Sequence, residues 1–254
     1  MTAGDFDYDQ HGAGYAVQRR TDPRLAAMVH AALGGARTVV NVGAGAGSYE
    51  PPDRYVVPVE PSAAMRAQRP PHLAPALNAT AERLPFDDGS FDAAMAMITV
   101  HQWADVDAGL RELRRVARGP VVVLTFDGTA LDALWLGEYA PELFAAESRR
   151  YPAIGSIAAL IGSRTDVRPV PVPIDCADGF TEAFYARPEA FLDARVRKAQ
   201  SAWGFVDPAA ERRAVDHLRA DLRTGAWDAR HGHLRDQPTF TGSLRLLTGH
   251  PDPY

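Results

Sequence analysis

The sequence of 254 residues predicts a doubly wound α/β fold, in which helices cover both faces of a largely parallel sheet. Three observations predict this fold. Apolar runs that fit buried strands alternate with amphipathic helical segments. A glycine-rich turn, VGAGAG, follows the first of these strands, and prolines at alternate positions place a later strand at a sheet edge.

The first helix is expected to begin at Pro23, because Asp22 before it is a good N-cap, and to end at Gly34 and Gly35. Apolar runs then predict strands at 38–42, 55–59, 76–79, 91–100 and 121–127. A helix over 107–116 places Leu110 and Leu113 on one face, which is the pattern of a helix packed on a sheet.

Residues 167–174, VRPVPVPI, carry prolines at positions 169, 171 and 173. In an extended chain these three prolines share one side, so a central strand would lose three ladder hydrogen bonds there. The sequence therefore places this strand at an edge of the sheet.

The C-terminal half reads as helical over 129–162, 187–202 and 207–222, with a last strand from Thr239. We expect a single domain over 1–254. Its parts are an N-terminal lid and helix (1–36), a core (37–127), helical cap elements with the edge strand (128–238) and the last strand (239–248).

Composition excludes several classes of protein. The net charge of −5 argues against nucleic-acid binding, and Cys176 is the only cysteine, so neither an internal disulfide nor a thiolate metal cluster is possible. His231 and His233 have no third ligand at useful spacing, so no metal is expected. The start of the chain lacks the pattern of a signal peptide, and no apolar run suits a membrane span, which predicts a cytoplasmic protein.

The glycine-rich turn predicts a cofactor that contains adenosine, because backbone without side chains can approach such a ligand closely. A dinucleotide motif needs a glycine where Ser48 stands, whereas the third glycine here is Gly47. Glu60, which ends the second strand, can accept hydrogen bonds from both ribose hydroxyls. The spacing favours S-adenosylmethionine over NAD.

Three segments, NVGAGAGSYE, VEPSAAM and AERLPFDDGSFDAAMAMITVHQW, together resemble class I S-adenosylmethionine-dependent methyltransferases of the type 11 small-molecule group. The resemblance covers roughly residues 39–103. It implies a Rossmann-like sheet of seven strands in the order 3-2-1-4-5-7-6, with strand 7 antiparallel. The sixth strand of that order is at an edge, as the prolines independently predict.

The resemblance also implies which residues contact the cofactor. Matching its motifs to this sequence gives Asn41, Gly43, Ala44, Gly45, Gly47, Glu60, Pro61, Ser62, Met65, Thr80, Ala81, Glu82 and Met97. The sequence departs from the family pattern at two of these, since members commonly carry an acidic residue where Asn41 stands and often an Asp where Thr80 stands.

The N-terminal segment YDQHGAGYAVQRR resembles the lid that members of this group fold over the cofactor. Tyr15 and Arg19 or Arg20 could meet the methionine carboxylate, because an arginine fork matches a carboxylate. An arm that gates the substrate would explain the same residues.

Methyl transfer requires a base only when the acceptor arrives protonated. His101 follows the fourth strand at the carboxyl edge of the sheet and is the candidate catalytic base, although packing or cofactor contact would also explain it. Substrate contacts are expected from His101, Gln102, Trp103, Trp135 and Tyr139.

The sequence therefore predicts a methyltransferase that uses S-adenosylmethionine, releases S-adenosylhomocysteine, and methylates O, N or C of a small-molecule acceptor, such as a secondary metabolite. We expect a monomer or homodimer that binds neither nucleic acid nor membrane. Two alternatives remain: a protein or cyclase that binds the cofactor without methyl transfer, and an RNA methyltransferase.

Overall fold

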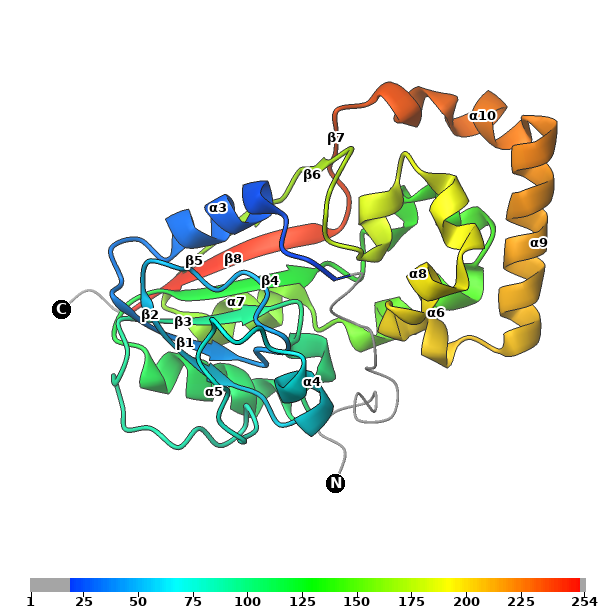
Figure 1. The fold of residues 1–254 in the computed structure, drawn as a ribbon. Helices are drawn as coiled ribbons and strands as arrows, with labels where there is room; N and C mark the ends of the chain where they lie inside the picture. The colour runs from blue at the N-terminus through cyan, green and yellow to red at the C-terminus, as the bar shows by residue number, and fades with distance from the viewer. Residues whose placement is uncertain (1–18, 252–254) are drawn as a thin grey trace.

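The computed structural model describes residues 19–251, and its centre is a twisted sheet with helices on both faces (Figure 1). Within this range the main sheet has six strands in the order β2-β1-β3-β4-β8-β5. Their bounds are β1 Thr38–Val42, β2 Tyr55–Val59, β3 Ala93–Met97, β4 Val121–Phe126, β5 Arg164–Pro169 and β8 Leu244–His250. The first four are mutually parallel, and β8 lies antiparallel between β4 and β5.

The predicted seven-stranded order is wrong by one strand. Residues 76–79 form no strand, because Leu77 makes a single parallel bridge to Val59. The ladder stops there since the amide of Ala79 turns back to the carbonyl of Leu77 at 3.2 Å. The α/β architecture with its mostly parallel sheet is as predicted.

Helices cover the two faces of the sheet through separate apolar clusters. On one face α3 (Pro23–Ala32) buries Leu25 and Val29 against β3 and β4. On the other, α5 (Val106–Val116) and α7 (Ile154–Ile161) pack together and bury Leu110 and Leu113. Figure 1 shows α3 and α5 on opposite sides of the sheet, with the short α4 (Ala63–Ala67) after β2.

Asp22 begins α3 as predicted, since its carboxylate accepts a hydrogen bond from the amide of Arg24 at 2.9 Å. The same carboxylate accepts from the amide of Ala177 at 3.0 Å and so ties the start of α3 to the chain after the edge strands. Burial opposes ionisation of Asp22, but the hydrogen bonds from Arg24 and Ala177 outweigh it and hold its pKa well below the usual range.

The predicted edge strand is at an edge, but its bounds differ. β5 covers Arg164–Pro169 and pairs only on its β8 side, whereas Val172–Pro173 forms β6 and pairs with β7, Thr239–Phe240, in a separate small sheet. Pro171 lies between these two strands. The predicted last strand is split in the same way, into β7 and β8.

Two further predictions are corrected. The strand expected over 91–100 is limited to β3, because Ile98 adopts a positive φ of 53° and turns the chain out of the sheet. The helix expected over 187–202 is broken where Asp193 caps a new helix through the amide of Arg195. It consists of the 3-10 segments Pro188–Leu192 and Ser201–Phe205, with α8 (Ala194–Lys198) between them.

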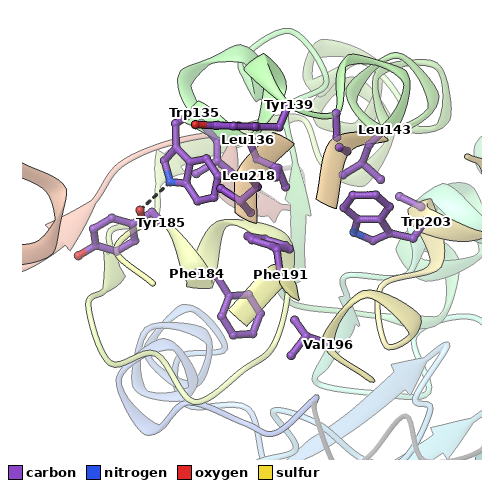
Figure 2. Close-up of a cluster of buried hydrophobic side chains, with 14 of the residues drawn as sticks. Trp135, Leu136, Tyr139, Leu143, Phe184, Tyr185, Phe191, Val196, Trp203 and Leu218 are labelled. Carbon is purple, nitrogen blue, oxygen red and sulfur yellow. Dashed lines mark hydrogen bonds between the residues drawn. The ribbon is translucent and has the colours of Figure 1, made fainter. Parts of the chain in front are cut away.

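A helical cap lies beside the carboxyl ends of the parallel strands (Figure 1). It contains α6 (Pro141–Arg150), α8, α9 (Pro208–Thr224) and α10 (Ala226–His231), together with 3-10 turns at Val100–Gln102, Leu131–Ala133, Trp135–Glu138, Thr181–Phe184 and Gly232–Asp236 that link sheet and cap. Its core is aromatic: the indole Nε1 of Trp135 donates to the carbonyl of Tyr185 at 2.7 Å, as Figure 2 shows.

Candidate functional site

The glycine turn after β1 has the backbone shape that its sequence predicts. Gly43, Gly45 and Gly47 all have positive φ, at 69°, 51° and 99°. A Cβ at Gly43 would collide with the side chain of Thr99, so this position accepts only glycine. The amides of Gly43 and Ala44 both donate to the carbonyl of Val59, at 2.9 and 3.0 Å, which fixes the turn against the end of β2.

Glu60 follows β2 and is almost entirely buried. One carboxylate oxygen accepts from the amide of Gly45 and the other from the amide of Ser62, both at 2.8 Å. Burial raises the pKa of Glu60, although these hydrogen bonds oppose the rise. Each oxygen retains a second lone pair, so the carboxylate can still accept from a vicinal diol.

Asn41 lies beneath this turn in a buried network. Its amide nitrogen donates to Glu50 at 2.9 Å, and Glu50 forms an ion pair with Arg69, also at 2.9 Å. Asn41 Oδ1 is buried and has no hydrogen-bond partner within residues 19–251. The network therefore holds a carboxylate next to Asn41 and leaves one acceptor atom available.

These groups line a cavity of about 560 Å³ at the carboxyl edge of the sheet, where open α/β sheets bind their ligands. The lining residues are Arg19, Asn41, Gly43, Ala44, Gly45, Ala46, Ser48, Tyr49, Glu60, Met65, Met97, Ile98, Thr99 and Gln102. We call this the cofactor cavity.

A second cavity, of about 520 Å³, adjoins the first and shares Arg19, Ile98 and Gln102 with it. Its other lining residues come from the end of β4, from the cap and from the turn before β8: His101, Phe126, Leu131, Leu134, Phe144, Glu147, Tyr151, Phe180, Thr181, Glu182, Gln200, Ser201 and Ser243. We call it the acceptor cavity.

Ile98 separates the two cavities and is strained. A positive φ is a genuine outlier for a β-branched residue. The amide of Ile98 still donates to the carbonyl of Leu124 at 2.7 Å, so the neighbouring strand holds this conformation in place. Strain of this kind is concentrated at functional sites.

Arg19 lies at the junction of both cavities. Its guanidinium contacts the buried carboxylate of Asp178 at 2.6 Å, and Tyr49 donates its hydroxyl to the same carboxylate at 2.7 Å. Burial and the neighbouring Asp178 raise the pKa of Tyr49 well above its ordinary value, so this phenol stays protonated. Arg20 is exposed and is not among the lining residues of either cavity, and Tyr15 lies outside the described residues.

Comparison with known proteins identifies the domain. Residues 40–123, which include the glycine turn, Glu60 and His101, match the family model described as a methyltransferase domain. A structure from Anabaena variabilis, assigned as a methyltransferase from an antibiotic biosynthesis pathway, is 26% identical and superimposes with a TM-score of 0.84 over 91% of this chain and 98% of its own. These matches support a class I S-adenosylmethionine-dependent methyltransferase domain in this part of the chain.

Two other relatives agree with this assignment. Demethylmenaquinone methyltransferase from Mycolicibacterium gilvum (strain PYR-GCK) is 35% identical over 104 residues, which are 40% of this chain and 45% of that protein. The match thus spans less than half of that curated relative. An S-adenosylmethionine-dependent methyltransferase from Thermotoga maritima shares the fold at 16% identity, with a TM-score of 0.56 over 96% of this chain and 97% of its own.

The fold brings half of the sequence-predicted cofactor residues, eight of sixteen, to the cofactor cavity. Those that line it are Arg19, Asn41, Gly43, Ala44, Gly45, Glu60, Met65 and Met97. Ser62 and Pro61 lie beside it, where the Ser62 hydroxyl caps α4 through the amide of Met65. Gly47 is not a lining residue, but a Cβ there would collide with Leu73.

Three of the residues expected to contact the cofactor, Thr80, Ala81 and Glu82, do not line the cofactor cavity in the described structure. Ala81 is buried in the core beside Leu110, and Thr80 lines neither cavity. Glu82 accepts from the amides of Ala104 and Asp105, at 2.9 and 3.2 Å, and thereby holds the turn that leads into α5. Their contact with a ligand remains a prediction.

Some of the residues predicted to contact the acceptor line the acceptor cavity, and others are packed in apolar cores. His101 and Gln102 line the acceptor cavity, whereas Trp103 packs against Gly109. Trp135 and Tyr139 lie in the aromatic core of the cap, and Tyr139 donates its hydroxyl to Asp221 at 2.9 Å. Because neither lines the acceptor cavity, we do not include them in the proposed site.

Sequence reasoning missed the polar residues that the cap brings to the acceptor cavity, Glu147, Tyr151 and Glu182. A signal for Glu147 was present, since it lies four residues after Leu143 and shares the apolar face of α6. A carboxylate on a buried helix face is unusual and marks a candidate site.

No helix within residues 19–251 is long and apolar enough to cross a membrane. In the same range, no group of three or more His, Cys, Asp or Glu residues is arranged to hold a metal ion. His231 instead contacts Glu138 at 3.1 Å.

Proposed function

We propose that this protein transfers the methyl group of S-adenosylmethionine to O, N or C of a small molecule bound in the acceptor cavity. The observation that carries the proposal is the pair of adjoining cavities, one lined by the glycine turn and Glu60, the other lined by aromatic and polar side chains. The antibiotic-pathway assignment of the Anabaena variabilis structure supports a secondary metabolite as acceptor.

The cofactor cavity fits S-adenosylmethionine on two structural grounds. A Cβ at Gly43 would collide with Thr99, so only glycine keeps this turn in place beside the cavity, and Asn41 Oδ1 is a buried acceptor without a partner in the described part of the chain. Asn41 and the turn would hold the methionine half, and Glu60 would accept the two ribose hydroxyls. When bound, the cofactor supplies an activated methyl group on a sulfonium, so the protein need only orient the acceptor and exclude water.

Calorimetry with S-adenosylhomocysteine tests cofactor binding. We expect saturable binding, and replacing Glu60 with Ala should weaken it by about 1 to 3 kcal/mol, because polar partners are left unpaired. Asp53→Ala is a matched control: this exposed carboxylate lies just before β2 and should leave the affinity unchanged. No binding at millimolar ligand would refute the proposal.

Methyl transfer is tested separately. Mass spectrometry of small molecules carried through purification should identify the acceptor, and formation of S-adenosylhomocysteine from S-adenosylmethionine should require that compound. A protein that binds the cofactor but forms no S-adenosylhomocysteine with its copurified ligand would be a binding protein or cyclase. Methylation of RNA in place of the small molecule would also contradict the proposal.

A further inference from the structure

Glu147 is a buried carboxylate that the fold leaves almost without partners. It lies on α6, is 6% exposed and lines the acceptor cavity. Within residues 19–251 its side chain has one hydrogen bond, a long one of 3.5 Å in which the hydroxyl of Tyr151 donates to Oε1. A buried carboxylate normally has several donors, so this one has acceptor capacity available for a ligand.

Two other polar groups of the acceptor cavity, Thr181 and Gln200, are satisfied within the protein. The hydroxyl of Thr181 donates to Gln200 at 3.0 Å, and Gln200 donates to the carbonyl of Gly179 at 3.3 Å. Glu182 accepts from the amide of Ser243 at 2.6 Å, so one of its oxygens is committed to the turn before β8. Glu182 Oε2 and the Ser243 hydroxyl are buried without a partner in the described range, but the backbone anchors Glu182 through its other oxygen, whereas Glu147 has only its single long contact.

Glu147, Tyr151 and His101 form one wall of the acceptor cavity. The imidazole of His101 packs edge-on against the ring of Tyr151, with centroids 4.8 Å apart. His101 Nδ1 is buried and has no hydrogen-bond partner in the described range. A ligand on this wall therefore meets two groups, one carboxylate and one ring nitrogen, that can each exchange a proton or a hydrogen bond.

Burial shifts the pKa values of Glu147 and His101 in opposite directions. Desolvation raises the pKa of Glu147 to about 7, with the charge of Glu182 acting in the same direction and Arg150, Tyr151 and Arg19 opposing it. Desolvation, together with the charges of Arg150 and Arg19, lowers the pKa of His101 well below its ordinary value. Near neutral pH the imidazole is a weak base, whereas the carboxylate binds a proton more tightly than ordinary carboxylates do.

We propose that Glu147 accepts the proton of the acceptor's nucleophile, and that this nucleophile is a hydroxyl or amino group on an otherwise apolar molecule. The inference rests on the proposed methyl transfer. As the bond from the acceptor's O or N to the methyl carbon forms, the bond from that carbon to sulfur breaks and its electron pair stays on sulfur. The displaced proton moves to the Glu147 carboxylate, so atoms and charge balance without another reactant.

The remaining lining supports this class of acceptor. Phe126, Phe144 and Phe180 give the cavity an aromatic surface for the apolar body of the molecule. Tyr151 lies between the two bases: its ring packs against His101, and its hydroxyl makes the one long contact to Glu147. A carbon nucleophile would give Glu147 no heteroatom proton to accept.

The kinetic test compares Glu147→Gln with Glu142→Gln, an exposed glutamate on the same helix that pairs with Arg213. The probes are small phenols and arylamines, each matched with its fully methylated form, and rates are taken on the fastest probe from about pH 5.5 to about pH 8.5. In the wild type kcat/KM should rise with pH to a plateau above about pH 7, because the base must be ionised. In Glu147→Gln, kcat at the plateau should fall about 100-fold and kcat/KM should no longer rise with pH, while the affinity for S-adenosylhomocysteine stays unchanged. Glu142→Gln should keep the wild-type kinetics.

A second measurement does not depend on turnover. The carbon-13 shift of the Glu147 carboxyl, assigned by its loss in Glu147→Gln, should titrate with an apparent pKa between about 6 and about 8 in the S-adenosylhomocysteine complex. Titration near the ordinary value of 4.5 would overturn the proposal. So would wild-type kinetics in Glu147→Gln, or loss of the pH-dependent rise in Glu182→Gln and not in Glu147→Gln. Loss of cofactor binding in the wild type would instead refute the proposed function.

Discussion

The cofactor and acceptor cavities share a wall but differ in how they are built. Except for Arg19, the lining of the cofactor cavity comes from residues 41–102. The acceptor cavity takes single residues from segments between Arg19 and Ser243. The first is a local structure that three strands and their turns provide, whereas the second exists only once the cap has packed.

The carboxylates of the two cavities show the same difference. Glu60 accepts two backbone hydrogen bonds of 2.8 Å, so its orientation is fixed before any ligand arrives. Glu147 has one contact of 3.5 Å in the described chain. The backbone can fully organise a site whose ligand is always the same molecule. A site where a proton is transferred needs a group that still has hydrogen-bonding capacity for the ligand.

The largest effect is expected at the glycine turn. Gly43→Ala combines a positive φ with a collision against Thr99, and we expect S-adenosylhomocysteine affinity to fall by about 100-fold or more. Gly225→Ala is the matched control, because Gly225 has a φ of 77° but no atom within 4 Å of its added Cβ. The control should lose about 1 to 2 kcal/mol of stability and no affinity. A folded Gly43→Ala protein with normal affinity would show that the turn does not hold the cofactor.

The next effect tests Glu147 through stability. Its folded pKa of about 7 lies above the ordinary 4.5, so the stability it contributes is fully present below about pH 4.5 and is lost as the pH rises to about 7. Glu147→Gln avoids this loss and should unfold with a free energy higher by on the order of 2 to 3 kcal/mol at about pH 8. Denaturation at about pH 4 should show almost no difference between the two proteins. Equal stability at both pH values would mean that Glu147 is not desolvated.

A smaller effect separates the cap from the cofactor region. Trp135→Phe and Trp227→Phe remove the same volume from the cap core, but Trp135 Nε1 donates to Tyr185 (Figure 2), whereas Trp227 Nε1 has no partner in the described chain. Trp135→Phe should therefore be the more destabilising by about 1 kcal/mol in urea denaturation. Neither should change the affinity for S-adenosylhomocysteine, and a loss in either would show that the two regions are coupled.

The smallest effect sharpens the role of Asn41. The family pattern suggests an acid there, but Asn41→Asp would set a second carboxylate against Glu50, where the amide now donates at 2.9 Å. We expect three- to fivefold weaker binding of S-adenosylhomocysteine, less than about 1 kcal/mol, because like charges disfavour each other. Adding Glu50→Gln should restore the affinity. Tighter binding in the single variant would contradict this account.

The sequence predicted the bounds of helices and strands correctly where neighbouring residues determine them. β1 and β2 begin and end as expected, and Asp22 with Pro23 and Asp207 with Pro208 mark the starts of α3 and α9. The predicted bounds are wrong where contacts between residues far apart in the sequence determine where an element ends. Ile98 ends β3 through a backbone conformation that its residue type disfavours, and Val172–Pro173 pairs with β7 instead of continuing β5.

The residues of the candidate site could likewise be predicted only where a local sequence pattern indicates them. The glycine turn and Glu60 could be predicted from the sequence because they belong to one turn and to the end of the next strand. Both line the cofactor cavity. Tyr49 and Thr99 line it too, but nothing in their local pattern says so. Trp135 and Glu147 are only twelve residues apart, yet the aromatic residue is core and the carboxylate lines the cavity. Such a distinction depends on cap packing, which periodicity does not encode.

The position of β8 has a consequence for how the chain assembles. Within the described chain β5 touches the main sheet only through β8, which lies between it and β4. Residues 170–243, with most of the cap, separate β5 from β8 along the sequence. Because β8 also pairs with β4 across residues 127–243, we expect this side of the sheet to close late and the cofactor half to form before the acceptor half.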